Sequence, residues 1–178
     1  MRKGLVVALA VALLVFGSPG LADKGTFRDR NDTSGRLDMK RFTHGHAGSG
    51  AVIHEVTMFR GFPSRLLKAP SPAKKQLRPN TVWFFFDTNR DNRAERAVAV
   101  RWNRGQLRAV VTNQSGRVFG QAKASRPNRR TIKIKVKHGR LGRDRFRPYK
   151  WWPNTYYRGD EVCSRKCSDT VRRSRLHD

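Results

Sequence analysis

The chain has 178 residues, of which 39 are Lys or Arg and 13 are Asp or Glu, so its formal net charge is +26. A surface this basic repels its own copies and attracts polyanions, so we expect a monomer that binds acidic polymers. The length fits one domain with its own core. After residue 22 no segment approaches the ~18 consecutive apolar residues of a membrane span, which excludes a membrane-spanning mature chain.

Residues 1–22 have the pattern of a secretory signal peptide. A positively charged start precedes an apolar run from Leu5 to Phe16, and small residues precede a cleavage point after Ala22. The run is short for a ~30 Å bilayer, although an uncleaved anchor is the alternative. We therefore expect a secreted or cell-wall-associated protein whose residues 23–160 form the folded domain.

Apolar and polar residues alternate through much of the domain, and no long helical periodicity is present. Short turn sequences separate the alternating segments, which predicts antiparallel neighbours. The segments lie at residues 36–42, 51–59, 81–87, 95–102, 106–112, 117–125, 131–137 and 149–157. Seven or eight strands in this length predict an all-β fold, a two-layer antiparallel β-sandwich of Ig-like or jelly-roll-like shape. Residues 62–79 contain four prolines and are predicted to form a crossover loop or lid.

A loop rich in acidic and amide residues joins two of the predicted strands. Oxygen ligands at alternate loop positions suit a hard cation such as calcium, and this spacing is met by Asp87, Asn89, Asp91 and Glu95. Asp and Asn are also good turn residues, and two arginines in the loop compete for the carboxylates. A structural hairpin tip and a bound calcium ion therefore both remain open, and no other cofactor is expected.

The same loop carries a family resemblance. The run F-D-T-N-R-D-N-R-A-E-R resembles the acidic hairpin of β-sandwich modules such as family 9 carbohydrate-binding modules and DOMON-like domains. The chain also resembles uncharacterised secreted proteins of actinobacteria, through Leu37-Asp38-Met39-Lys40-Arg41, Thr43-His44-Gly45-His46, Ser125 to Asn128 and Tyr149-Lys150-Trp151-Trp152. The resemblance covers residues 27–157 and implies a β-sandwich that binds carbohydrate.

Aromatic side chains gather near the end of the domain, where Trp151 and Trp152 are followed by Tyr156 and Tyr157. Exposed flat rings can stack on sugar faces. Consecutive residues of a strand point to opposite faces, so at most one of the two tryptophans is available to a ligand. The alternative is that these rings complete the core.

A basic face is predicted where two consecutive strands carry cations at alternate positions. The cations are Arg117, Lys123, Lys133, Lys135 and Lys137, with Phe119 among them. Like charges opposed across strands are unfavourable, and a bound polyanion would relieve that repulsion. The alternative is a solvated outer face whose lysines protect an edge from aggregation.

The cysteines and histidines are few. Cys163 and Cys167 predict a disulfide in an exported chain, and this bond would close a small loop in the basic tail, residues 161–178. The last ten residues are expected to be mobile. A metal site at His44 and His46 would need a third ligand, and an unliganded turn is the favoured interpretation.

No catalytic motif is present, because the chain has no G-x-S-x-G, no Gly-rich phosphate loop and no preferred carboxylate pair. The sequence therefore favours a non-catalytic secreted protein that binds an anionic cell-wall or extracellular polymer through its basic surface. A neutral-carbohydrate-binding module and a hydrolase on a β-sandwich scaffold are the alternatives. Specific nucleic-acid binding is not expected, because export makes it a poor physiological role.

Overall fold

The computed structural model describes residues 25–47, 50–68, 80–142, 147–158, 167–171 and 175–177. These residues form β-strands and two short 3-10 helices, and no α-helix is present among them. The strands are β1 (Thr26–Arg28), β2 (Met39–Ala47), β3 (Ala51–Met58), β4 (Thr81–Asp87), β5 (Arg96–Asn103), β6 (Gln106–Thr112), β7 (Val118–Asn128), β8 (Thr131–Lys137), β9 (Tyr149–Tyr157), β10 (Cys167–Thr170) and β11 (Arg175–His177). The 3-10 helices are η1 (Ser64–Leu67) and η2 (His138–Leu141). Within the described segments no helix is long and apolar enough to cross a membrane.

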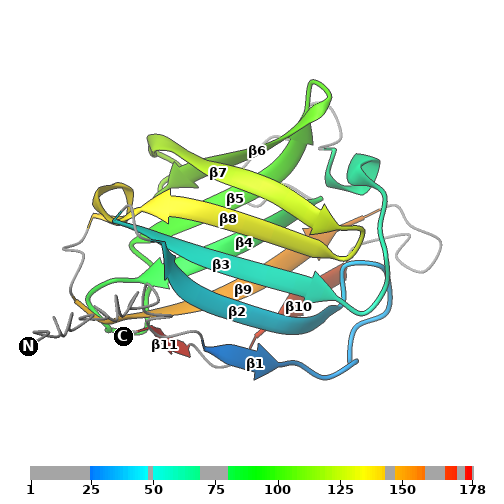
Figure 1. Ribbon diagram of the computed structural model, residues 1–178, viewed down its shortest axis with the longest axis horizontal. Coiled ribbons are helices and arrows are strands. Elements are labelled where there is room, and N and C mark those ends of the chain that lie inside the picture. Colours follow the sequence, from blue (N-terminus) through cyan, green and yellow to red (C-terminus); the bar gives the residue numbers. More distant parts are fainter. Residues whose placement is uncertain are drawn as a thin grey trace, which may run out of the picture.

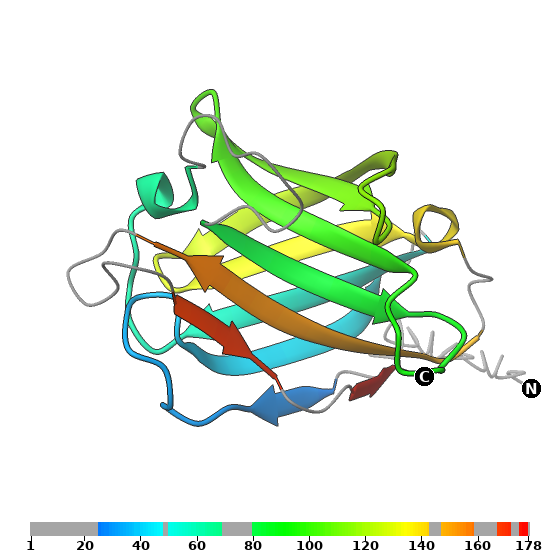
Figure 2. The ribbon, with the colours of Figure 1, turned by 180° about the vertical axis from the view of Figure 1, so that it is seen from behind.

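The strands form a single antiparallel sheet that curls into a half-barrel. Its order is β1-β2-β3-β8-β7-β6-β5-β4-β9-β10, and β11 pairs with β9 beside β10. Figure 1 shows β2, β3, β8 and β7 in front of β5, β4 and β9, and Figure 2 shows the same curl from behind. The predicted all-β class is confirmed. The predicted two-layer sandwich of seven or eight strands is wrong, because there is one continuous sheet with more strands.

The continuity of the sheet comes from β7, which belongs to both halves. Ala122 of β7 is paired with Ala109 of β6, and the next residue, Lys123, is paired with Lys135 of β8. The register shifts on both sides of β7, and such bulges bend a strand and increase its twist. One long bent strand therefore turns the sheet over, where a sandwich would use a loop between two sheets.

The predicted strand positions agree well with β3 to β9, and four of the eight predicted segments have the observed bounds: β4, β6, β8 and β9. The segment predicted at residues 36–42 overlaps β2 only at residues 39–42. The turn predicted at His44 and His46 is wrong, because both residues lie within β2 and pair with β3. The short strands β1, β10 and β11 were not predicted. The expectation of a mobile tail is wrong for β10 and β11, which lie along β9. β10 pairs with residues 154–157 of β9, and β11 pairs with residues 149–151.

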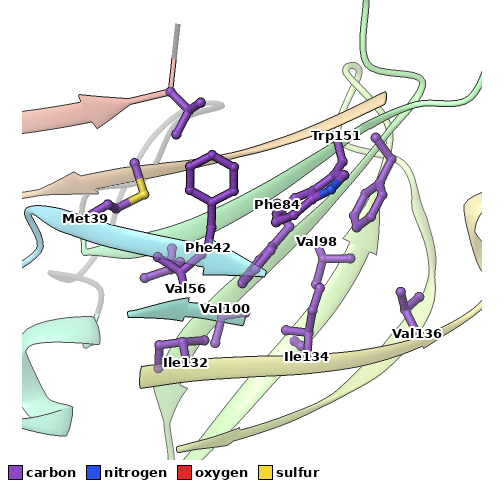
Figure 3. Close-up of a cluster of buried hydrophobic side chains, with 14 of the residues drawn as sticks. Met39, Phe42, Val56, Phe84, Val98, Val100, Ile132, Ile134, Val136 and Trp151 are labelled. Atoms are coloured by element: carbon purple, nitrogen blue, oxygen red, sulfur yellow. The ribbon is translucent and has the colours of Figure 1, made fainter. Parts of the chain in front are cut away.

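The core fills the concave side of the curled sheet, where side chains from both halves meet. Figure 3 shows Phe42 and Val56 of one half facing Phe84 and Trp151 of the other. Trp151 is fully buried, and its ring meets the Phe42 ring edge-on with 5.5 Å between centroids. Burial of large side chains of this kind contributes about 1.5–3 kcal/mol each, so the apolar filling holds the curl closed.

The two edges of the sheet are joined where the loop before β2 reaches β9 and β10. The Thr155 hydroxyl donates to the Leu37 carbonyl oxygen at 2.7 Å, and the Tyr157 hydroxyl donates to the Ser34 carbonyl oxygen. The Met39 amide donates to Oδ2 of Asp169 at 2.6 Å. We call this contact between residues 29–39 and β9–β10 the seam.

Candidate functional site

A groove of about 1290 Å³ opens at the end of the half-barrel near η1. Its walls come from η1 and the residues before it, from the β5–β6 turn, from the end of β7, and from single residues beside β2, β4 and β9. The lining residues are Arg36, Gly61, Phe62, Pro63, Ser64, Arg65, Leu66, Asn80, Trp102, Gly105, Gln106, Leu107, Arg126, Asn128, Arg129 and Arg158. Barrel mouths are common ligand sites, because the sheet holds the wall residues rigidly.

The charge of this lining is entirely positive. Five arginines contribute to it, and no Asp or Glu is among the described residues that line it. Four of the arginines are exposed at the rim, namely Arg36, Arg65, Arg129 and Arg158. A concave site lined by one sign of charge focuses the field and raises the local concentration of counter-ions, so the groove attracts anions.

Arg126 is held in place by the backbone of the groove. Its Nη1 donates to Oγ of Ser64, and its Nη2 donates to the carbonyl oxygens of Phe62 at 2.6 Å and Arg129 at 2.9 Å. The guanidinium lies 4.3 Å from the centroid of the Phe62 ring. Burial lowers the pKa of Arg126 from its usual value, but arginine still remains charged at neutral pH. Arg126 therefore gives the wall a fixed cation and connects the end of β7 to η1.

The floor of the groove is apolar. Trp102 and Leu107 are half-buried and pack against the main core, and Leu66, which also lines the groove, is buried. An isolated bridge between Lys68 and Trp102 holds the chain after η1 against β5. The β5–β6 turn completes the rim with two residues of positive φ, Arg104 at 48° and Gly105 at 79°, as the tight two-residue hairpin requires. The groove thus combines a ring surface with surrounding guanidinium groups.

The predicted basic face exists on the convex side of β7 and β8. Lys123 lies directly opposite Lys135 in the β7–β8 register, and Lys137 continues the row at the end of β8. Lys133 forms a salt bridge with Glu55 of β3 at 2.9 Å. We call Lys123, Lys135 and Lys137 the lysine row.

Phe119 and Arg117 lie apart from the lysine row. The register shift between β6 and β7 breaks the alternation before Gly120, and Phe119 packs against the core. The guanidinium groups of Arg96 and Arg117 lie 3.8 and 5.4 Å from its ring centroid. The sequence prediction placed Phe119 among the lysines because it assumed an unbroken period of two.

The two adjacent tryptophans point to opposite faces of β9, as predicted. Trp151 is fully buried in the core, so it offers no surface to a sugar. Trp152 lies half-buried on the convex face, where its ring stacks on Phe85 with 5.7 Å between centroids. Phe85 in turn stacks on Trp83 at 5.8 Å. Trp83 also packs with Ala97 and Ala99, and Arg101 lies 5.8 Å from its ring centroid.

The predicted calcium loop brings its acidic groups together. One carboxylate oxygen from each of Asp87, Asp91 and Glu95 lies within 4.8 Å of the others. Asp87 accepts the amides of Asp91 at 3.1 Å and Asn92 at 2.8 Å, and Oε2 of Glu95 accepts the amide of Thr88 at 2.6 Å. Asn89 also bonds within the loop, its Oδ1 accepting the Asp91 amide at 3.0 Å. These bonds account for the hairpin tip, and a bound calcium ion here stays a prediction.

The histidines and cysteines fall in different places. His44 and His54 face each other across β2 and β3 and are buried in the core, whereas His46 is exposed. Oη of Tyr149 lies 2.7 Å from Nε2 of His54.

Cys163 lies outside the described residues, as does the leader at residues 1–22, so the disulfide with Cys167 stays a prediction.

The groove arginines were missed at the sequence level. They come from four separate segments of the chain, and only the curl of the sheet brings them together. The one local signal is the pair Arg126 and Arg129, which flank a predicted turn. Comparisons of the chain with models of protein families, with curated proteins and with solved structures find no match.

Proposed function

We propose that the protein is a non-catalytic binding protein that holds an anionic polymer in the groove beside η1. The observation that carries this proposal is the composition of the groove, which has five arginines and no described acidic residue among its lining. Arginine matches phosphate and carboxylate groups with two parallel hydrogen bonds, so it suits both phosphate-containing and uronic-acid-containing chains. The leader pattern supports an extracellular or cell-wall location for this activity.

A polymer is favoured over a small anion because basic residues continue beyond the groove. Arg126 and Arg129 lie at the groove end of the β7–β8 hairpin, and Lys123 and Lys135 follow on the same hairpin. A chain of negative charges could contact both regions, whereas a single small anion would fill only one. The Trp102 ring would add contact area for a sugar or another flat group.

The alternatives have weaker support. The neutral-carbohydrate alternative places sugar stacking at Trp151 or Trp152, but Trp151 is buried and Trp152 is covered on one side by Phe85. A hydrolase with paired carboxylates would need acidic groups facing a cleft. The described acidic clusters lie at the seam and at the β4–β5 loop, and none of their residues lines the groove.

The test compares two variants that lose the same charge. The groove variant carries Arg65→Gln, Arg129→Gln and Arg158→Gln, and the control carries Arg28→Gln, Arg41→Gln and Arg93→Gln, all at exposed positions. Binding to polyphosphate, poly-L-glutamate and neutral dextran is measured by fluorescence anisotropy from low to high salt. The groove variant should lose at least ~10-fold in affinity for the polyanions, because the focused field is removed. The control should lose less than ~3-fold, since exposed charges at a distance are screened.

Two results would overturn the proposal. Equal losses in the two variants would mean that affinity comes from the overall charge, with no preference for the groove. Dextran binding that is as tight as polyanion binding and insensitive to salt would favour the carbohydrate-binding alternative.

A further inference from the structure

Several acidic side chains meet at the seam, where the two edges of the curled sheet touch. Asp32 and Asp38 belong to the loop between β1 and β2, and Asp169 lies in β10. One carboxylate oxygen from each lies within 4.8 Å of the others. Asp38 and Asp169 are each only 2 % exposed, whereas Asp32 reaches the surface. The cluster therefore connects segments more than 130 positions apart in the chain.

This is one of two such acidic clusters among the described residues of a very basic chain. The whole sequence has 13 acidic residues against 39 basic ones, yet three acidic residues converge here. Burial of an ionised carboxylate is costly unless a charge or several hydrogen bonds compensate it.

The hydrogen bonds at the seam satisfy the carboxylates only in part. Oδ2 of Asp169 accepts the Met39 amide at 2.6 Å. Oδ1 of Asp38 is buried and has no hydrogen-bond partner among the described residues. A buried, unpartnered carboxylate oxygen beside two further carboxylates is an acceptor without a donor, which is the arrangement that a cation would complete.

The distances within the cluster agree with this view. Three carboxylates whose oxygens lie within 4.8 Å of one another repel each other when they are ionised, and a bound cation would remove that repulsion.

We propose that a calcium ion binds at the seam, held by the carboxylates of Asp32, Asp38 and Asp169. Calcium takes six to eight oxygen ligands in flexible geometry, and carboxylates, backbone carbonyls and water supply them in loops of this kind. The all-oxygen donor set excludes a typical zinc site, which uses histidine or cysteine. The exposed side of Asp32 provides the entry path.

The ion would act on the curl of the sheet. Its ligands come from the loop before β2 at one edge and from β10 at the other, so binding requires the two edges to be together. Any ligand that binds the folded state alone raises its stability by mass action. This inference is independent of the proposed groove, because none of the three ligands lines it.

The test measures calcium binding and thermal unfolding of the full chain. Asp32→Asn is the main variant, because Asp32 is exposed and its replacement should leave the fold intact. Asp91→Asn is the matched control, since it removes one carboxylate from the other acidic cluster in the β4–β5 loop. Calcium at ~1 mM, the affinity range of extracellular modules, should raise Tm by several degrees relative to EDTA. Isothermal titration calorimetry should show at least ~10-fold weaker binding at the seam in Asp32→Asn and little change there in Asp91→Asn.

A second variant distinguishes a bound calcium ion from a proton that Asp38 and Asp169 share. Asp38→Asn removes the buried carboxylate and should abolish both the calorimetric signal of the seam site and the calcium-dependent rise in Tm. If Asp38 and Asp169 instead share a proton, Asp38→Asn will raise Tm in EDTA and calcium will have no effect on the parent protein. That result, or calcium binding that is lost in Asp91→Asn and kept in Asp32→Asn, would overturn the proposal.

Discussion

The indole Nε1 of Trp151 donates a hydrogen bond of 2.9 Å to Nδ1 of His44 in the middle of the core. The two residues lie in β9 and β2, which are near opposite edges of the sheet order. The bond therefore spans the inside of the half-barrel and requires the curl. It also explains why a histidine is tolerated in an apolar core, because a buried polar atom needs a partner.

Trp151→Phe should destabilise the protein by about 1–3 kcal/mol. The replacement keeps an aromatic ring but removes the N–H that satisfies His44, and an unsatisfied buried acceptor costs about that much. Urea unfolding followed by circular dichroism measures the change.

The matched control is Trp152→Phe, on the half-buried convex face of the same strand. It should cost less than ~1 kcal/mol, because it leaves no buried polar atom without a partner. Equal losses in the two variants would mean that the hydrogen bond contributes nothing beyond ring packing.

Lys135→Glu should stabilise the fold by about 0.2–1 kcal/mol. Lys135 lies directly opposite Lys123, so the replacement turns a repulsive cross-strand pair into an attractive one. The comparison is Lys137→Glu, which changes the charge equally but faces Ala51 across the β3–β8 pair. The gain should shrink at high salt, since exposed charges are screened. Similar shifts in the urea midpoint for both variants would assign the effect to net charge alone.

The sequence predicted most strand positions correctly, but it did not predict how the sheet curls and closes. Alternation is local, so β4, β6, β8 and β9 were predicted with their observed bounds. The bulges that bend β7 depend on its pairing with two different strands. The alternation of apolar and polar residues in the sequence does not reveal them. The sandwich prediction failed for that reason.

The candidate sites also differ in whether they follow from local sequence or from contacts between distant segments. The lysine opposition between Lys123 and Lys135 follows from two adjacent strands, and it was foreseen. The groove and the seam depend on contacts between distant segments. Asp38 and Asp169, for example, carry no shared motif, and the short β10 sequence shows no clear alternation.

Gly35→Ala should cost more than ~2 kcal/mol. Gly35 has φ of 118°, a backbone conformation that only glycine adopts without strain. A Cβ at this position would also clash with the Tyr157 side chain, since it would lie 2.0 Å from Oη. Gly50→Ala is the control, because Gly50 also has positive φ, 64°, but a Cβ there meets nothing within 4 Å. The control should lose only the cost of holding alanine in the left-handed region, about 1–2 kcal/mol. Thermal unfolding that shows equal losses would exclude a special role for the contact between Gly35 and Tyr157.

In EDTA the protein should lose stability as the pH rises from about 4 to about 7. Burial raises the pKa of Asp38 to about 6 and the pKa of Asp169 to about 7, above the usual value of 3.8. The folded state therefore holds these protons more tightly than the unfolded chain, and raising the pH through this window favours unfolding. The loss should be on the order of a few kcal/mol and level off above the folded pKa values. Asp169→Asn should flatten the profile, because an amide does not titrate, whereas Asp91→Asn should leave it unchanged. Urea unfolding at a series of pH values measures it, and a parent profile that rises over this window would show that the buried carboxyls stay ionised.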